Sequence, residues 1–167
     1  MKKRFLLLIA SLFLLSGCSQ SKSNEINVNN PYEIAKGTST LSYYDLEENI
    51  NIDGFNVVEN NLQNFQDKNN NIIINDDGVI RCITIVDDTV KTFQSISVGD
   101  SIDKIENAFE HEYKLNNYYN VVFNNNTEED SANQNKEDTW ICITYYTDGS
   151  KITSIYIYDV LYGREFK

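Results

Sequence analysis

The sequence has little of the chemistry on which enzymes and metal sites depend. It contains one histidine, His111, and one proline among 167 residues. With one histidine, the chain cannot form a cluster of histidine metal ligands or a histidine-based catalytic triad. It has no glycine-rich phosphate-binding loop, and none of its acidic stretches alternates oxygen ligands as a calcium-binding loop does. We therefore expect no metal, no cofactor and no catalytic residue.

Long apolar runs are also missing after the first 15 residues. The run Phe5–Leu15 follows the basic residues Lys2, Lys3 and Arg4. It is shorter than the roughly 20 apolar residues that a membrane-spanning helix needs. A basic start followed by a short apolar run is typical of a secretory signal peptide.

The residues that end this run, Leu15-Ser16-Gly17-Cys18, resemble the lipobox of bacterial lipoproteins. The resemblance implies that Cys18 carries the lipid and that residues 1–17 are removed as a signal peptide. Two or more acyl chains hold a protein on a membrane, whereas one chain binds reversibly. We therefore expect a lipid anchor in the cell membrane and a protein that faces outside the cytoplasm. A plain signal peptide with an unmodified cysteine is the alternative.

Basic residues are scarce, because 14 Lys and Arg face 25 Asp and Glu, for a formal charge of −11. Removal of Lys2, Lys3 and Arg4 with the signal would take that charge to −14. A surface this acidic repels nucleic acid and anionic headgroups. We predict that nucleic acid is not a partner, and we interpret the charge as favouring solubility.

Three cysteines occur, and Cys82 and Cys142 remain once Cys18 is acylated. Both lie in runs rich in β-branched residues, which favour strands. In an exported protein the two thiols can form a disulfide. The alternative is that each is a small buried apolar residue.

Polarity divides the remaining chain into a tether and one domain. Residues 18–36 are rich in Ser and Asn and contain Pro31, which predicts a flexible tether. Residues 37–167 are enough for a single domain with its own core. We predict an α+β fold in which one or two short helices lie on one face of an antiparallel β-sheet.

Hydrophobic periodicity locates the expected elements. The spacing of Ile102, Ile105 and Phe109 predicts a short helix. Residues 40–51 are compatible with another helix, and Asp53-Gly54 predicts a hairpin turn. The expected strands are 72–74, 79–86, 90–98, 118–123, 140–146 and 151–158, with a loop over 124–138 and a tail over 161–167.

The sequence contains a short repeated segment. Cys82-Ile83-Thr84 recurs 60 residues later as Cys142-Ile143-Thr144. This pattern favours two tandem copies of a helix followed by a β-meander, over residues 53–98 and 99–158. Chance matches in a biased composition are the alternative.

The segment Ser95–Ile105, SISVGDSIDKI, resembles the "I-x-x-G-D-S-x-x-x-V" pattern that leads into a helix in small bacterial lipoproteins. It is similar to the SmpA/OmlA (BamE-type) group and to the β-lactamase-inhibitor-protein-like fold. The resemblance covers about residues 93–158 and implies short helices on one face of an antiparallel sheet, sometimes in tandem. It implies fold more than function, because members of the group differ in role.

Aromatic residues gather in the C-terminal strands. Tyr156 and Tyr158 share one face of the strand 151–158, and the intervening isoleucines share the other. If the isoleucines meet the core, the tyrosine face is open and forms, with Trp140 and Tyr146, a candidate contact surface. The alternative is that tyrosine simply suits strands, or that a second layer covers it.

Together these features predict a membrane-anchored, non-catalytic module that binds an envelope or secreted protein. A cell-envelope enzyme remains an alternative, and it would need a cleft with a carboxylate of raised pKa. The sequence is also compatible with a small-ligand-binding lipoprotein and with a passive spacer.

Overall fold

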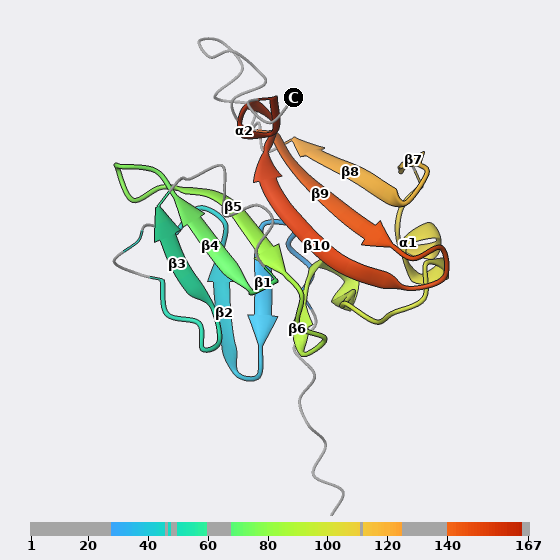
Figure 1. Cartoon of the computed structure of the whole chain (residues 1–167), viewed down its shortest axis with the longest axis horizontal. Coiled ribbons are helices and arrows are strands. Elements are labelled where there is room, and N and C mark those ends of the chain that lie inside the picture. The colour runs from blue at the N-terminus through green and yellow to red at the C-terminus, as the bar shows by residue number, and fades with distance from the viewer. Residues whose placement is uncertain are drawn as a thin grey trace, which may run out of the picture.

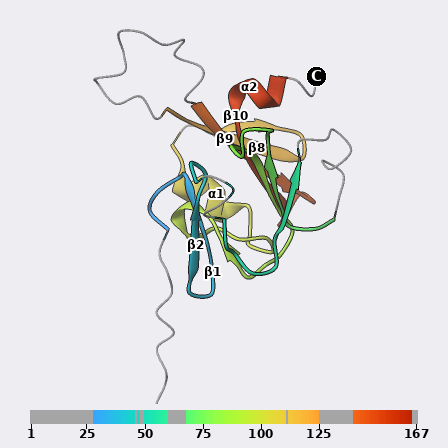
Figure 2. The same ribbon diagram turned by 90° about the vertical axis from the view of Figure 1, so that its left-hand side faces the viewer.

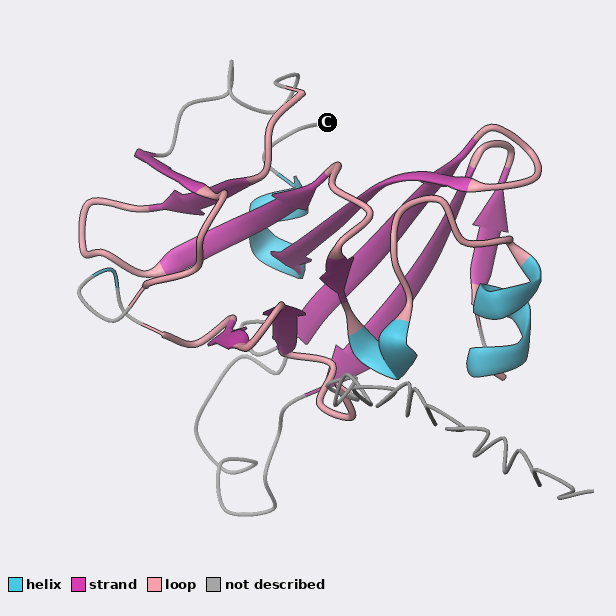
Figure 3. Ribbon diagram, turned by 90° about the horizontal axis from the view of Figure 1, so that it is seen from below, coloured by secondary structure: helices cyan, strands magenta, loops and turns pink. Residues whose placement is uncertain are grey.

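The computed structural model describes residues 28–45, 47, 50–59, 68–110, 112–124 and 140–164. These residues are mostly β-structure with a few short helices, as the coarse α+β prediction expected (Figure 3). The predicted signal peptide with Cys18, His111 and the loop from 125 to 138 lie outside the described residues.

Within the described ranges, most strands belong to one seven-stranded sheet (Figure 1). In sheet order the strands are β3 (Asn56–Glu59), β4 (Asn71–Ile74), β5 (Ile80–Ile85), β10 (Ile152–Asp159), β9 (Trp140–Thr147), β8 (Tyr118–Asn124) and β7 (Tyr113–Leu115). Neighbours pair antiparallel except β3 and β4, which are parallel. The sheet is therefore mixed, and the prediction of an antiparallel sheet is wrong at this edge.

A smaller sheet and a helix cover one face of the large sheet. The small sheet has the order β2-β1-β6, with β1 at Glu33–Lys36, β2 at Ser39–Ser42 and β6 at Val90–Lys91. Its residues Ile34 and Leu41 form one buried core with Ile105 of helix α1 (Asp103–Ala108) and Ile157 of β10. A second helix, α2 (Val160–Arg164), lies on the opposite side of the large sheet (Figure 2).

Several predicted elements are confirmed. The strands predicted at 72–74, 79–86, 118–123, 140–146 and 151–158 correspond to β4, β5, β8, β9 and β10. The helix predicted from Ile105 and its neighbours is α1, in which Ile105 is fully buried and Phe109 is nearly so. Ile155 and Ile157 of β10 face the core, so the expected division of this strand into an isoleucine face and a tyrosine face is confirmed.

The predicted boundary between a tether at 18–36 and a domain at 37–167 is wrong. Residues Glu33–Lys36 form β1, and Ile34 is fully buried in the core. Upstream, Val28 is also buried, and its carbonyl accepts the backbone N–H of Gln94 at 2.9 Å. The domain therefore includes residues from Val28 onward. A few apolar side chains are enough to attach this otherwise polar segment to the core.

The helix expected over 40–51 and the hairpin expected at Asp53-Gly54 are wrong. Residues Ser39–Ser42 form β2, in which Leu41 pairs with Ile34 of β1 and is buried beside it. The Asp53-Gly54 turn does form, with Gly54 at φ +80°, but β3 then pairs with β4 and not with the residues before the turn.

The strand expected over 90–98 is also wrong, because only Val90–Lys91 is a strand and it pairs with β1. The chain then kinks at Gln94 and Ser95, whose φ angles are 58° and 57°. The tail expected over 161–167 is wrong for the residues up to Arg164, which belong to α2.

The repeated Cys-Ile-Thr segments flank β10 symmetrically. Cys82 of β5 and Cys142 of β9 both lie opposite Tyr158, and the two threonines both lie opposite Tyr156. The connections that follow differ, since β5 is followed by a strand of the small sheet whereas β9 is followed by β10 itself.

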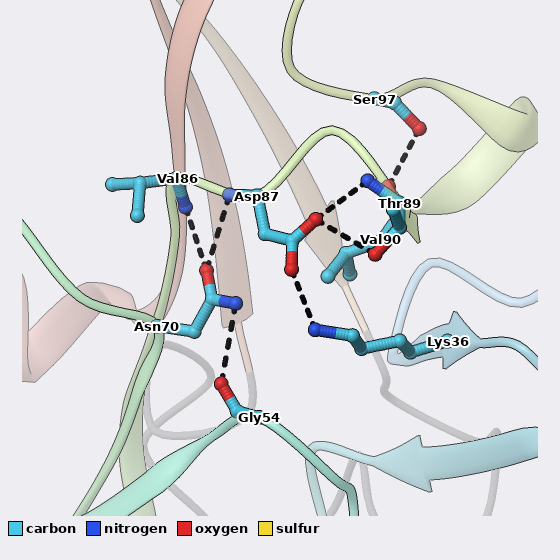
Figure 4. A network of polar contacts seen from close by, with 8 residues as sticks. All are labelled: Lys36, Gly54, Asn70, Val86, Asp87, Thr89, Val90 and Ser97. Atoms are coloured by element: carbon cyan, nitrogen blue, oxygen red, sulfur yellow. Dashed lines mark hydrogen bonds and ion pairs between the residues drawn. The ribbon is translucent and has the colours of Figure 1, made fainter.

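A polar network joins the two sheets (Figure 4). The Lys36 ammonium of β1 contacts the Asp87 carboxylate at 2.5 Å, and Asp87 also accepts the backbone N–H and hydroxyl of Thr89 at 2.7 Å each. The side-chain carbonyl of Asn70 accepts the N–H groups of Val86 and Asp87. These bonds hold the start of β4 and the end of β5 against the small sheet.

Candidate functional site

One face of the large sheet points away from α1 and the small sheet, and we call it the outer face. The side chains in its two central rows are uncharged. Strand pairing aligns two rows of side chains on this face. One row comprises Val58, Ile73, Cys82, Tyr158, Cys142 and Val122, and the other comprises Asn56, Asn71, Thr84, Tyr156, Thr144 and Asn120. Charged residues make up 23% of the chain, so these two uncharged rows differ from its average composition.

Three tyrosines form a contiguous cluster on the half of this face built by β8, β9 and β10. We call Tyr118, Tyr146 and Tyr156 the tyrosine patch. The ring centroids of Tyr118 and Tyr146 lie 5.7 Å apart, and those of Tyr146 and Tyr156 lie 5.1 Å apart. Tyr146 is 40% exposed, and the other two are half-buried.

Tyr146 and Tyr156 of the tyrosine patch are uncharged at neutral pH. Burial raises the pKa of Tyr146, and the neighbouring phenols of Tyr156 and Tyr118 raise it further. Burial likewise raises the pKa of Tyr156. The patch therefore offers aromatic surface and neutral hydroxyl groups, which is a composition typical of the centre of a protein interface.

The structure brings three of the four predicted contact residues together on the outer face and places the fourth, Trp140, at the start of β9. Tyr146 and Tyr156 adjoin in the patch. Tyr158 points to the same face, but it is half-buried, and its hydroxyl lies 2.9 Å from the Thr144 hydroxyl. Trp140 lies at the start of β9 and is half-buried, with its indole nitrogen enclosed. Both side chains are therefore less exposed than Tyr146.

Tyr118 belongs to the patch although it is not among the four predicted contact residues. It lies on β8 directly opposite Tyr146 of β9. The signal that locates it is the pairing register of β8 and β9, because residues opposite one another on antiparallel strands have adjacent side chains.

Helix α2 covers a part of the outer face next to the tyrosine patch. Its Tyr162 is fully buried and forms a cluster with Ile73 and Cys82, both of which are fully buried. Gly163 lies against the ring of Tyr158, where a Cβ atom would come within 2.5 Å of a ring carbon. A glycine is therefore required at this close approach.

Asp159, the last residue of β10, anchors the start of α2. Its carboxylate accepts the Tyr162 backbone N–H at 2.5 Å, which caps the first turn. The same carboxylate lies 3.3 Å from the Arg81 guanidinium and accepts the Tyr43 hydroxyl at 3.2 Å. Arg81 also lies over the Tyr162 ring, 5.6 Å from its centroid. The anchor thus combines β5 and β10 of the large sheet with Tyr43, which directly follows β2 of the small sheet.

Cys82 and Cys142 are free and buried, so the interpretation as small buried residues is confirmed over the disulfide. Both lie opposite Tyr158, one on each side of β10. Strands two positions apart lie roughly 10 Å from each other, which is beyond the reach of a disulfide. Burial raises the pKa of each thiol, which makes both unreactive at neutral pH.

Three carboxylates of the described residues have lowered pKa values. The Lys36 ammonium lowers the pKa of Asp87 to about 2, the Tyr119 hydroxyl lowers that of Glu106, and backbone N–H groups of its own turn lower that of Asp148. A catalytic acid needs the opposite shift. These three side chains therefore act as ionised acceptors that hold loops and ion pairs.

Comparison with known proteins adds no relative, since no family model, curated protein or solved structure matches the chain. Across the described ranges, no three His, Cys, Asp or Glu side chains gather as a metal ion would require. No helix in that part of the protein is long and apolar enough to cross a membrane.

Proposed function

We propose that this protein is a lipid-anchored module of the cell envelope that binds another envelope or secreted protein through the tyrosine patch. The observation that carries the proposal is an uncharged, partly exposed aromatic face in a strongly acidic chain. Interface centres are depleted in charge and enriched in tyrosine, so such a face suits protein contact.

The proposed location rests on the lipobox and on the length of the segment that follows it. Cys18 would carry the lipid, and residues 1–17 would be removed. The ten residue-to-residue steps from Cys18 to Val28 span at most about 35 Å. The domain would therefore stay close to the outer surface of the membrane, and a partner must lie within that reach.

The resemblance of residues 93–158 to the SmpA/OmlA (BamE-type) group belongs to the same proposal, as do the tandem copies over 53–98 and 99–158. The Gly-Asp-Ser segment has a local rationale, since Gly99 adopts a φ of +86°. The Asp100 carboxylate accepts the Ser97 N–H at 2.7 Å and pairs with Lys104 at 2.8 Å. The symmetric placement of the Cys-Ile-Thr segments beside β10 supports the copies.

Cross-linking in intact cells tests the proposed function. The full chain is expressed with its own signal, cross-linked, and recovered with whatever it binds. Replacing Tyr146 and Tyr156 together by Ser should reduce recovery of the partner at least about tenfold, because aromatic residues at an interface centre carry much of the binding energy. Both side chains are partly exposed, so the domain should stay folded.

Two controls make this experiment specific. Tyr44→Ser removes an exposed tyrosine outside the patch and should leave partner recovery unchanged. Cys18→Ala should release the protein from the membrane. Equal recovery by the Tyr146/Tyr156 double variant and by the unsubstituted protein would refute the patch as the binding site.

A further inference from the structure

The tyrosine patch and the side chains under helix α2 belong to one continuous surface of the outer face. Tyr158, in the uncharged row of the outer face, touches Gly163 of α2, and the next residue on that face of β10 is Tyr156 of the patch. Beyond Tyr158 the same row continues through Cys82 to Ile73, both under Tyr162. The part of the row under α2 is therefore a direct extension of the patch.

The contacts of α2 are separate from the main core. Tyr162, Ile73 and Cys82 form a cluster of their own on the outer face, whereas the large core lies on the inner face. Departure of α2 would open this small cluster and leave the inner core closed. The helix has five residues, and their freed backbone would regain conformational entropy, which offsets part of the lost burial.

The hinge for such a motion is also present. Asp159 belongs to β10 and contacts Tyr43 and Arg81, which lie outside α2. Its bond to the backbone N–H of Tyr162 and the contact of Arg81 with the Tyr162 ring would break when α2 leaves. The contacts of Asp159 with Tyr43 and Arg81 can persist, so that the chain would pivot between Asp159 and Val160. Elements at the end of a domain with few contacts commonly open at a free energy below that of global unfolding.

We propose that α2 is a hinged cover that leaves the outer face while the rest of the domain stays folded. Its departure extends the tyrosine patch across β5 and β4 by an apolar, uncharged row. A partner that binds the extended face more tightly than the covered face would shift the population toward the open state. This regulatory role rests on the proposed binding function, but the motion itself is a property of the chain alone.

The thiol of Cys82 reports the motion directly, because it is fully buried beneath Tyr162. The full chain with Cys18→Ala and Cys142→Ser contains this one thiol. Its rate of labelling by a maleimide is measured in native buffer and at low urea concentrations. The reference is the same chain with Cys82→Ser and Ala35→Cys, which places the thiol at a buried position of the small sheet.

We expect the Cys82 thiol to react at least about tenfold faster than the thiol of the Ala35→Cys variant, with a weaker urea dependence, as a local opening requires. Tyr162→Ala should raise the Cys82 labelling rate on the order of 100-fold, because it removes the side chain that holds α2 down. Ile143→Val, in the inner core, should speed labelling of the Ala35→Cys thiol and leave the Cys82 rate unchanged.

Equal rates and equal urea dependence for the two thiols would overturn the proposal, since the outer face would then open only with global unfolding. An unchanged rate in the Tyr162→Ala variant would overturn it as well. Neither result depends on a partner. Failure of the cover is thus distinguishable from failure of the proposed function, which the cross-linking experiment tests.

Discussion

Replacing Asn70 by Ala should lower the free energy of unfolding by about 2–3 kcal/mol. Asn70 is buried, and its side-chain carbonyl accepts the backbone N–H of Val86 at 2.8 Å and that of Asp87 at 3.2 Å (Figure 4). A net hydrogen bond contributes about 1 kcal/mol, and leaving a buried N–H unpaired adds a desolvation penalty. The N–H groups of Val86 and Asp87, both half-buried residues, lose their acceptor at once, which sets the expected magnitude.

Asn75 provides a matched control within the same chain. Its side-chain carbonyl also accepts two backbone N–H groups, from Asp77 at 3.1 Å and Val79 at 2.9 Å, but both bonds are exposed in a turn. Water can replace the lost acceptor there, so Asn75→Ala should cost less than about 1 kcal/mol.

Urea denaturation followed by far-UV circular dichroism measures both variants at pH 7. The urea dependence of the unfolding free energy should stay constant, because neither substitution changes the area exposed on unfolding. Equal losses for Asn70→Ala and Asn75→Ala would refute the reasoning, since each side-chain carbonyl accepts two backbone N–H groups and the two sites differ in burial. The side-chain amide of Asn70 also donates to the Gly54 carbonyl at 3.4 Å, which adds to the expected loss.

Two other predictions concern titration and oxidation. The Lys36 ammonium lowers the pKa of Asp87 from 3.8 to about 2. The contribution of the Lys36–Asp87 pair to the free energy of unfolding is therefore complete above about pH 4 and is lost as the pH falls toward 2. Solvent screening limits this contribution to about 1 kcal/mol. Urea titrations at pH 6 and pH 2 measure it, and the Lys36→Met variant should lose less stability between these two pH values than the unsubstituted protein. Cys82 and Cys142 should remain unpaired under a mild oxidant without denaturant, and a loss of two hydrogens in the intact mass would contradict their separation across β10.

The candidate site was partly predictable. Alternation along β10 sufficed to place Tyr156 on the face opposite the core, because successive side chains of a strand point to opposite faces. It did not indicate that Tyr118 adjoins Tyr146, which depends on how β8 pairs with β9. Nor did it indicate that α2 covers Tyr158, because a helix of five residues has too few positions to show a period.

The sequence by itself determined the local elements whose pattern is long or strongly apolar, namely the strands β4, β5, β8, β9 and β10 and the stripe of α1. It also carries the segment Leu15–Cys18, which resembles a lipobox and on which the expected location rests. Only the tertiary structure decided which strands pair. Thus β3 runs parallel to β4, β6 joins β1, and Val28 and Ile34 attach the supposed tether to the core. The physical reason is that a strand's face follows from its own alternation, whereas its neighbours follow from burial shared with residues far along the chain.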